Sequence, residues 1–560
     1  MNIARINLSK GTITVSKIPS DLKPYIGGKG IATKLLFGIL PKVDPFHPDN
    51  AIIFGIGPVN GIRLSGASRV TAVFKSPLTF GYGESQCGGY LAYEMKKAGI
   101  DFLYITGKAR KPVYISVEDR NIEIKDASHL WGKDSYETEE ILEKEEGGEI
   151  LSIGQAGENL VRFACINHRK GRQFGRGGAG AVMGSKMLKA IVVKGSGEVE
   201  VADSDRLREF RKWMLENVVS KLEGMKRYGT LGIANLTNEA GVLPTKYWER
   251  GSFEELEKIN AEAFDRYTEK STACYGCAVS CGKIRKAGDV EVEGPEYETL
   301  YAFGPLCYNS DAESIFRAND LCDRYGMDTI SAGNVVAFYM ACSERGEVDE
   351  RVDFGDSNAI LELLKKIAFR QDIGDILAEG SKIASERMGV SVEAVHVKGL
   401  EPPGYDPRGL YSMALAYVTS HRGACHMRSC AYRPNLTGAV DRFSVDKQAE
   451  LVKDLEDFYC VVDSFVFCRF LCLPVIGMYW QDIARLYEIV TGNSVSVEDL
   501  KKAGESIWNL TREFNLREGV VDENLPSTFF RPVKHYDREL VVRKEDFDRM
   551  VEKYRSLRGL

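Results

Sequence analysis

The hydrophobic pattern of this 560-residue chain changes partway along it, and this change constrains the fold more than any other feature. In the first part, short alternating or apolar runs are separated by Gly, Pro and Asp, a pattern typical of strands. From about Asp205, apolar residues recur at helical spacing, as at Ile315, Ala318, Leu321 and Cys322. The runs that predict strands are NIARINL, TITVSK, AIIFGI, RVTAVFK, FLYITG, VYISVE and AIVVKG. We therefore expect an α+β protein whose β-rich part comes first.

The length of the chain exceeds what one hydrophobic core supports, so we expect several domains. A Pro/Gly-rich stretch, LEPPGYDPRGL at 400–410, interrupts the helical pattern and marks a second boundary. Between the boundaries, Asp328 can cap a helix that runs from Thr329 to about Cys342. The expected domains are a β-rich N-terminal domain at 1–204 and two mainly helical domains at 205–400 and 401–560.

Charge and hydropathy exclude several classes of function. The net charge of −6, without a basic stripe, argues against a nucleic-acid partner. The N-terminal MNIARINLSKG contains no apolar run of signal-peptide length, and AIIFGIGPV at 51–59 is too short to span a bilayer. We expect a cytoplasmic protein that does not bind a membrane. In that compartment, thirteen cysteines are buried thiols, metal ligands or redox groups rather than disulfides.

Three cysteines at C-x2-C-x3-C spacing lie in TACYGCAVSCGK: Cys274, Cys277 and Cys281. Thiolates are soft ligands, and one loop can offer three of them to zinc or to an iron–sulfur cluster. Radical enzymes that use S-adenosylmethionine carry the reverse order, so this spacing argues against them. A closed cluster needs a fourth thiolate from a distant segment, and spacing alone does not choose it. The candidates are Cys460, Cys468 and Cys472.

A series of motifs in a fixed order resembles the tungsten-containing aldehyde ferredoxin oxidoreductases. In that family the metal is held by the dithiolenes of two pyranopterins, so no protein ligands for it are expected. The resemblance fits tungsten and molybdenum equally, and it implies that the cofactor is buried at the domain interfaces. Besides the cysteine triplet, the motifs are YIGGKGIATKLL, SGASRVTAVFKSPLT, SQCGGY, GRGGAGAVMGSKMLKAI, GPEYET, DRYGMD, EPPGYDPRG, HRGACHMR and DSFVFC.

Two of these motifs, DRYGMD at 323–328 and DSFVFC at 463–468, resemble the family's pterin-binding sequences. The resemblance makes Asp323 and Asp463 acceptors for pterin N–H groups and makes Cys468 the fourth cluster ligand. Val466 and Phe467 stand where Gly and Leu are usual, which affects the backbone more than the carboxylate or the thiol. The other motif positions expected at the cofactor are Met327, Asp328 and Phe467.

The glycine-rich GRGGAG at 175–180 satisfies a dinucleotide-binding pattern, but the apolar strand that this pattern requires before it is replaced by HRKGRQF. The resemblance instead assigns this stretch to pterin phosphates, where Gly permits close backbone approach and Arg offers a fork of donors. It also implies Mg²⁺ bridging the phosphates near SQCGG, and an arginine between pterin and cluster. The residues assigned in this way are Arg69, Gln86, Gly88, Arg176, Gly177 and Arg428.

Glu298 and His426 are the candidates for acid–base chemistry. A buried carboxylate with a raised pKa can remove a proton during aldehyde oxidation, and an imidazole can stabilise charge on the carbonyl oxygen. The resemblance selects Glu298 from the acids of GPEYET, with Glu296 next in line. His421 competes with His426.

The reaction that the resemblance implies is R-CHO + H₂O to R-COOH, with two electrons passed through a [4Fe-4S] cluster to ferredoxin. One alternative is the catalytic subunit of a larger complex that reduces a carboxylic acid or an aromatic substrate with the same cofactor. Another is an electron-relay subunit, which the presence of both pterin aspartates and Glu298 disfavours. Some relatives form dimers around a mononuclear iron, but Arg317 stands where its Glu ligand would be, so we expect any homodimer to form without iron.

Overall fold

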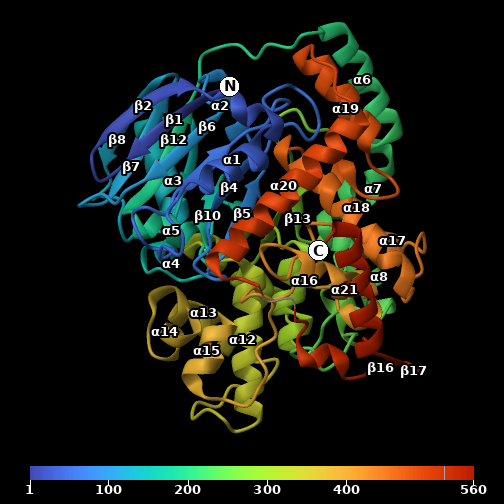
Figure 1. Cartoon of the computed structure of the whole chain (residues 1–560). Coiled ribbons are helices and arrows are strands. Elements are labelled where there is room, and N and C mark those ends of the chain that lie inside the picture. Colours follow the sequence, from blue (N-terminus) through green and yellow to red (C-terminus); the bar gives the residue numbers. More distant parts are fainter. Residues whose placement is uncertain (522–523) are drawn as a thin grey trace.

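The computed structural model describes residues 1–521 and 524–560. A β-rich N-terminal part is followed by a mainly helical part, as expected (Figure 1). The strands of the first part are β1 (Asn2–Asn7), β2 (Thr12–Lys17), β3 (Ile52–Gly55), β4 (Val70–Lys75), β5 (Tyr82–Cys87), β6 (Phe102–Thr106), β7 (Val113–Glu118), β8 (Asn121–Asp126), β9 (Glu149–Ser152), β10 (Ile166–His168), β11 (Arg172–Phe174) and β12 (Leu188–Lys194).

These strands form two six-stranded sheets, ordered β2-β1-β6-β3-β4-β5 and β11-β10-β9-β12-β7-β8. All seven runs predicted as strands are strands, namely β1, β2, β3, β4, β6, β7 and β12. The remaining strands are shorter or more polar, and the sequence did not predict them. GRGGAG follows the short antiparallel hairpin β10–β11 rather than a βαβ unit, in agreement with the argument against a dinucleotide fold. The helices of this part are α1 (Gly28–Leu36), α2 (Leu91–Lys97), α3 (Ser135–Glu145), α4 (Gln155–Glu158) and α5 (Ala179–Ser185).

The helical part carries one three-stranded sheet, β13-β14-β15, and one hairpin, β16–β17. Asp328 caps α12 as predicted, because its side chain accepts from the N–H of Ile330 at 3.1 Å. The strands are β13 (Thr268–Thr272), β14 (Gly282–Ala287), β15 (Val290–Glu293), β16 (Val533–His535) and β17 (Arg538–Leu540). The helices are α6 (Ser204–Asn217), α7 (Glu223–Tyr228), α8 (Ala234–Glu239), α9 (Ala261–Asp265), α10 (Tyr297–Phe303), α11 (Ala312–Tyr325), α12 (Thr329–Glu344), α13 (Ser357–Phe369), α14 (Ile373–Leu377), α15 (Ser381–Met388), α16 (Tyr411–Thr419), α17 (Tyr432–Leu436), α18 (Val445–Ser464), α19 (Trp480–Thr491), α20 (Val497–Glu518) and α21 (Lys544–Arg558).

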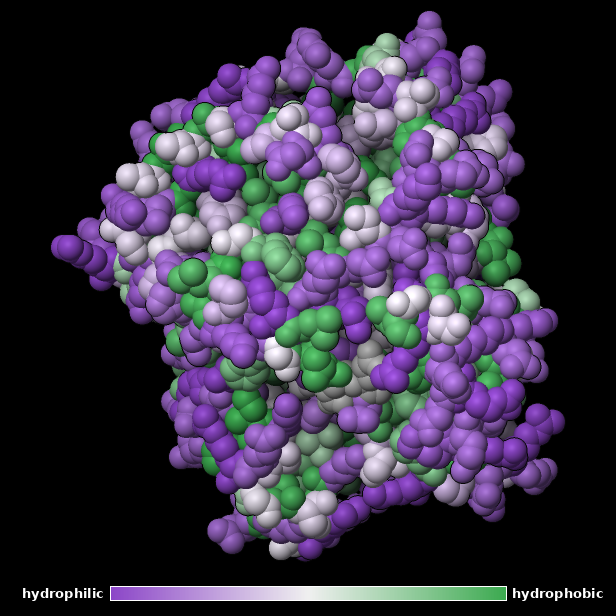
Figure 2. Space-filling view, in the orientation of Figure 1, coloured by the Kyte–Doolittle hydropathy of each residue, from purple (hydrophilic) through white to green (hydrophobic). Residues whose placement is uncertain are grey.

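Packing between the two parts positions the site. Helix α20 lies beside α18, α1 and β5, so a late segment of the chain covers one of the first sheets (Figure 1). The largest apolar cluster includes residues of both parts, from Val59 to Tyr554. Hydrophilic residues cover most of the face seen in Figure 2, and apolar residues appear there mainly in small groups. Within residues 1–521 and 524–560, no helix is both long and apolar enough to span a membrane.

Candidate functional site

A cavity of about 520 Å³ lies between the N-terminal and helical parts, and an adjoining cavity of about 200 Å³ shares several of its walls. The shared residues include Arg69, Gln86, His426 and Cys468. Many of the site residues that the sequence predicted line these two cavities. The expected residues that line one or both cavities are Arg69, Gln86, Gly88, Arg176, Cys274, Cys277, Cys281, Glu298, His426, Arg428 and Cys468.

The cysteine triplet occupies the connection between the antiparallel strands β13 and β14. Its turn is closed by a 3.1 Å hydrogen bond from the N–H of Cys277 to the carbonyl of Cys274. Burial, then Glu296 and Cys468, raise the pKa of Cys281 well above its usual value, so Cys281 and Cys468 are electrostatic neighbours. Of the other two candidates for the fourth thiolate, Cys460 lies in a separate small cavity that Lys29 also lines.

The side chains that line this cavity fit a metal cluster better than a single metal ion. Among the residues that the structure describes, no group of three His, Cys, Asp or Glu side chains is placed to hold one ion. The four cysteines surround a cavity instead of converging on a point. This arrangement fits a cubane, which brings its own irons and sulfides between the thiolates.

Strand β5 brings the backbone close to the triplet. A Cβ atom at Gly88 would lie 2.8 Å from Sγ of Cys274 and 3.4 Å from Nη1 of Arg69, so only glycine fits there. Nη2 of Arg69 donates to the carbonyl of Gln86 at 2.9 Å. A Mg²⁺ ion at that carbonyl would therefore compete with the guanidinium.

Arg172 is a neighbour of the cysteines that the sequence analysis did not select. Its Nη1 lies 3.1 Å from Sγ of Cys274, and its Nη2 donates to Glu293 at 2.7 Å. The positive charge of Arg172 therefore lies directly beside the sulfur of Cys274. The stretch HRKGRQF therefore contributes a cation to the cysteine end of the cavity, and no local pattern in the sequence indicated this.

Glu298 and His426 meet at the wall of the larger cavity. Glu298 lies in the first turn of α10, and its Oε2 accepts the N–H of Gly404 at 2.9 Å. Its Oε1 lies 3.5 Å from Nε2 of His426. Within the described chain, this Oε1 and Nδ1 of His426 are buried without a hydrogen-bond partner. Unsatisfied buried atoms at a cavity wall are free to bind a ligand.

The environment sets the protonation of this pair. Burial raises the pKa of Glu298 to about 8, and the N–H of Gly404 offsets part of this increase. Burial and the nearby cation Arg176 lower the pKa of His426 well below its usual value. At neutral pH the carboxyl group is therefore mostly protonated and the imidazole is neutral, so the pair can exchange a proton with a ligand.

The smaller cavity is lined by arginines. Nε of Arg428 and Nη1 of Arg469 are buried there and have no partner within the described chain. Guanidinium groups in this state fit phosphate oxygens, which accept forked hydrogen bonds. This chemistry fits the phosphates of a pterin cofactor. The arginines lining this cavity are Arg69, Arg176, Arg422, Arg428 and Arg469.

Arg176 joins this cavity to the first pterin motif. Its Nε donates to Asp328 at 3.1 Å, and its other nitrogens donate to the carbonyls of Ala424 and Glu401 at 3.0 and 2.5 Å. Gly177 has a φ of +87°, so the chain turns away after Arg176, and its carbonyl accepts from Ser76 at 2.8 Å.

The motif DRYGMD ends helix α11. Asp323 accepts hydrogen bonds from Gln173 and, at 2.7 Å, from Asn319, which are neutral donors. Burial and the neighbouring Asp320 raise its pKa well above the usual range. Gly326 has a φ of +75°, and the N–H of Met327 donates to the carbonyl of Cys322 at 2.8 Å.

The motif DSFVFC ends helix α18 with the same turn. Val466 has a φ of +51°, and the N–H of Phe467 donates to the carbonyl of Val462 at 3.0 Å. The substitution of Val for Gly therefore leaves the backbone bond in place, although a β-branched residue is strained in this conformation. Asp463 accepts from Gln86 at 3.1 Å. It also contacts cations, namely Arg469, Arg428 at 3.2 Å and Lys29 at 3.9 Å.

The expected residues outside the cavity walls lie behind them. Asp323, Asp328 and Asp463 each bond to a residue that lines a cavity, namely Gln173, Arg176 and Gln86. A second group packs in the interior. It comprises Gly177, Met327 and Phe467.

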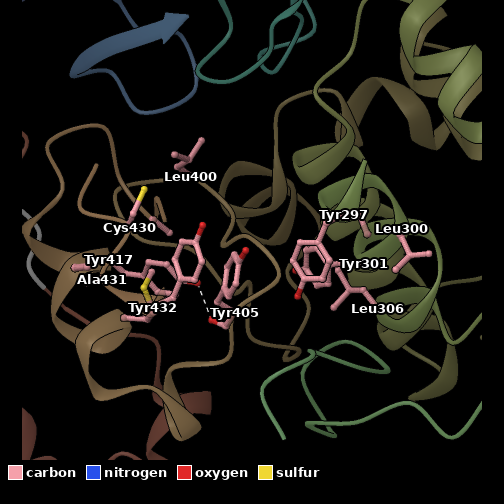
Figure 3. Close-up of a cluster of buried hydrophobic side chains, with 14 of the residues drawn as sticks. Tyr297, Leu300, Tyr301, Leu306, Leu400, Tyr405, Tyr417, Cys430, Ala431 and Tyr432 are labelled. Carbon is pink, nitrogen blue, oxygen red and sulfur yellow. Dashed lines mark hydrogen bonds between the residues drawn. The ribbon is translucent and has the colours of Figure 1, made fainter. Parts of the chain in front are cut away.

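Three tyrosines, Tyr297, Tyr405 and Tyr432, line the larger cavity together with Glu298. Tyr405 is stacked on Tyr432 with ring centroids 4.2 Å apart, and the ring of His426 lies 5.3 Å from that of Tyr405. The hydroxyl of Tyr417 donates to the carbonyl of Tyr405 at 2.7 Å, which holds this segment in place. The sequence analysis did not select these residues, although Tyr405 lies inside EPPGYDPRG. Tyr301 and Tyr417 belong to the same buried cluster of side chains (Figure 3).

Comparison with known proteins agrees with this arrangement. Residues 3–195 match the family described as aldehyde ferredoxin oxidoreductase, N-terminal domain, and residues 206–560 match its domains 2 & 3. The chain is 38% identical to the tungsten-containing aldehyde ferredoxin oxidoreductase of Pyrococcus furiosus, over 99% of this chain and 95% of the relative. It is also 38% identical to the protein of the same name from Thermococcus kodakarensis, with the same coverage.

A solved structure shares the fold. The active site complex BamBC of benzoyl coenzyme A reductase, in complex with 1,5 dienoyl-CoA, superposes with a TM-score of 0.86 and 25% identity. The match covers 100% of this chain and 94% of that chain. Since the family profiles and the relatives each extend over nearly the whole length, the chain belongs to the aldehyde ferredoxin oxidoreductase family.

Proposed function

We propose that the protein oxidises an aldehyde to a carboxylic acid at a tungsten bis-pyranopterin centre and passes the electrons through a [4Fe-4S] cluster to ferredoxin. The reaction R-CHO + H₂O gives R-COOH, two protons and two electrons. The observation that carries the proposal is the shared cavity, in which the Glu298–His426 pair, the four cysteines and a set of arginines face the same space. Relatives at 38% identity with this activity in their names support it.

The chain supplies the binding groups for the cofactors. Cys274, Cys277, Cys281 and Cys468 would hold the cluster, with Arg172 beside the first of them. The arginines of the smaller cavity would hold the pterin phosphates, and Mg²⁺ would bind near Gly88, which lines the larger cavity. When it is bound, the tungsten–pterin group supplies two-electron oxidation.

Proton transfer belongs to the side chains. Glu298 in its ionised form accepts the proton released during oxidation, and its raised pKa makes it a stronger base than an exposed carboxylate. His426 is neutral and can donate a hydrogen bond to the substrate oxygen from a ring nitrogen. The tyrosines around the pair exclude water from the substrate.

Electrons leave on the side of the cysteine loop. Tyr275, between Cys274 and Cys277, is half-buried and stacks on Tyr93 with centroids 4.0 Å apart. A one-electron carrier such as ferredoxin would reach the cluster at this loop. We place the protein in the cytoplasm, where its thirteen cysteines would stay reduced.

The experiment is to replace Glu298 by Gln in anaerobically purified protein and to measure tungsten, iron and aldehyde-dependent dye reduction. The amide keeps the shape and removes the base, so the metal content should stay normal while kcat falls by about 10²–10⁴-fold. Glu296→Gln is the matched control, because Glu296 lines the same cavity, and it should keep most of the activity. Near-native turnover in Glu298→Gln would refute the assignment.

The pH profile gives a second readout. Because the ionised carboxylate is the active form and its pKa is about 8, kcat/KM should rise with pH and level off above about 8. Glu298→Gln should lack this rise. A profile that falls through the same range would show that the acid form is the active one.

A second candidate is the catalytic subunit of a larger complex that reduces a carboxylic acid or an aromatic substrate. The superposition on BamBC favours it. With a low-potential electron donor, such an enzyme would reduce an aromatic coenzyme A thioester. The proposed enzyme would instead reduce dye with aldehydes.

Any homodimer would form without bridging iron, because Arg317 forms an ion pair with Asp289 at 2.7 Å.

A further inference from the structure

The larger cavity has a distinct end beyond the Glu298–His426 pair. The rings of Tyr405 and Tyr432, which are stacked on each other (Figure 3), line the cavity there. Leu436 and Met427 line the same cavity and add apolar surface. A substrate whose carbonyl group contacts Glu298 would extend along this wall.

Arg433 follows Tyr432 on helix α17 and also lines the larger cavity. It is half-buried, and its Nε is buried with no hydrogen-bond partner in the described chain. In residues 1–521 and 524–560, no carboxylate lies within 4.0 Å of its guanidinium nitrogens. By contrast, Arg172 and Arg176, elsewhere in the cavities, each pair with a carboxylate, at 2.7 and 3.1 Å.

Tyr432 places Arg433 relative to the reacting end. Burial and Cys430 raise the pKa of Tyr432 and Glu298 adds to this increase, whereas Arg433 lowers it. The hydroxyl of Tyr432 therefore lies within electrostatic reach of both Glu298 and Arg433. Glu298, Tyr432 and Arg433 all line the larger cavity, so one ligand can contact both Glu298 and Arg433.

An unpaired, partly desolvated guanidinium is costly unless a ligand supplies the missing acceptor. Its planar fork of donors matches a carboxylate or a phosphate. We propose that the preferred substrates are short aldehydes that carry an anionic group at the end opposite the carbonyl, and that Arg433 binds this group. The inference rests on the proposed aldehyde oxidation and specifies its substrate class.

Matched pairs of aldehydes test the preference in the holoenzyme. Succinic semialdehyde is compared with butanal for a carboxylate, and glyceraldehyde 3-phosphate with glyceraldehyde for a phosphate. A charge-assisted hydrogen bond made only by the anionic member should raise its kcat/KM about tenfold or more, mainly through a lower KM. The pair that shows this increase identifies the anion. Equal values within both pairs would overturn the proposal.

Arg433→Gln should abolish the preference and leave kcat/KM for butanal within about twofold of wild type. Arg433→Lys keeps the charge without the fork and should restore part of the preference. Arg227→Gln is the control, since Arg227 is an exposed arginine on α7, a helix whose Met225 lines the same cavity. An unchanged preference in Arg433→Gln would assign the anion to another group.

A binding measurement separates this inference from the proposed function. Calorimetry with the holoenzyme compares succinate and butanoate, which require no turnover. Succinate should bind about tenfold more tightly than butanoate in wild type, and equally in Arg433→Gln. If no aldehyde is oxidised but this difference holds, the proposed reaction fails and the anion site stands. If butanal is oxidised and succinate binds no better than butanoate, the proposed reaction stands and the anion site fails.

Discussion

The loops DRYGMD and DSFVFC share a backbone and differ in chemistry. Each follows a long helix, contains a left-handed residue at its fourth position and makes the same hydrogen bond across its turn. Each is also attached to the N-terminal part, since Asp328 donates its N–H to Phe163 and Cys468 donates its N–H to Gly66, at 3.0 and 2.9 Å. The carboxylates differ, because neutral donors surround Asp323 and cations surround Asp463. Backbone hydrogen bonds therefore set the geometry of both turns, whereas the charges around the aspartate differ between the two loops.

The largest difference lies in the last residue of each loop, which is a helix cap in the first and a thiol in the second. Replacing Cys468 by Ser should remove the cluster, with loss of about four iron atoms per chain and of the reduced-cluster EPR signal. Cys460→Ser and Cys472→Ser are the controls and should keep both. A normal signal in Cys468→Ser would remove this contrast between the loops.

The two aspartates should respond unequally to neutralisation. Asp463→Asn leaves Arg469 buried without its anionic partner and should destabilise the fold by about 3–5 kcal/mol. Asp323→Asn affects only hydrogen bonds with neutral donors and should cost about 1 kcal/mol. Urea unfolding followed by circular dichroism gives both values. Equal losses would mean that the cations around Asp463 do not matter to stability.

Substitutions at Gly28 and Val466 test how the second loop accommodates the valine side chain. A Cβ at Gly28 would lie 2.0 Å from Cγ2 of Val466, so Gly28→Ala should cost roughly 1–3 kcal/mol. In a Val466→Gly background this cost should fall by about 1–2 kcal/mol, because the clashing methyl is gone. The double-mutant cycle measures this coupling. Additive effects would show that Gly28 does not compensate for the valine.

A smaller effect than at Gly28 is expected at the glycine of the first loop. Gly326→Ala places a Cβ in a left-handed conformation and 3.1 Å from the backbone nitrogen of Gly154, which should cost about 1–2 kcal/mol. Gly346→Ala is the control, since its φ of +69° is similar and nothing lies within 4 Å of its Cβ. The difference between the two losses of stability gives the cost of the close contact alone. If the two costs are equal, left-handed strain accounts for both.

The sequence predicted elements wherever local pattern and burial agree. The seven apolar runs are strands, and α12 begins directly after Asp328. Strand β5 escaped prediction because it contains the buried Glu84 and the half-buried Gln86, whose partners are ionic or polar groups from distant segments. The rule of apolar alternation does not apply to such a strand.

The site shows the same limit. Spacing identified the cysteine triplet, and motif order selected Glu298 and His426, because both signals are local. Arg172 and Arg433 have no local signal, since their neighbours at the cavity come from other parts of the chain. Their roles depend on the shape of a cavity that only the folded chain defines.

The cavity walls come from early, middle and late stretches of the chain, from Arg69 through Cys274 to Cys468. During synthesis the N-terminal sheets can fold while the ribosome has not yet made Cys468. Cofactor loading must therefore follow translation. Until it occurs, the buried nitrogens of Arg428 and Arg469 that lack partners remain unsatisfied where early and late segments meet. Unloaded chains should be the species that proteases remove first, so supply of the cofactors would set the cellular amount of this protein.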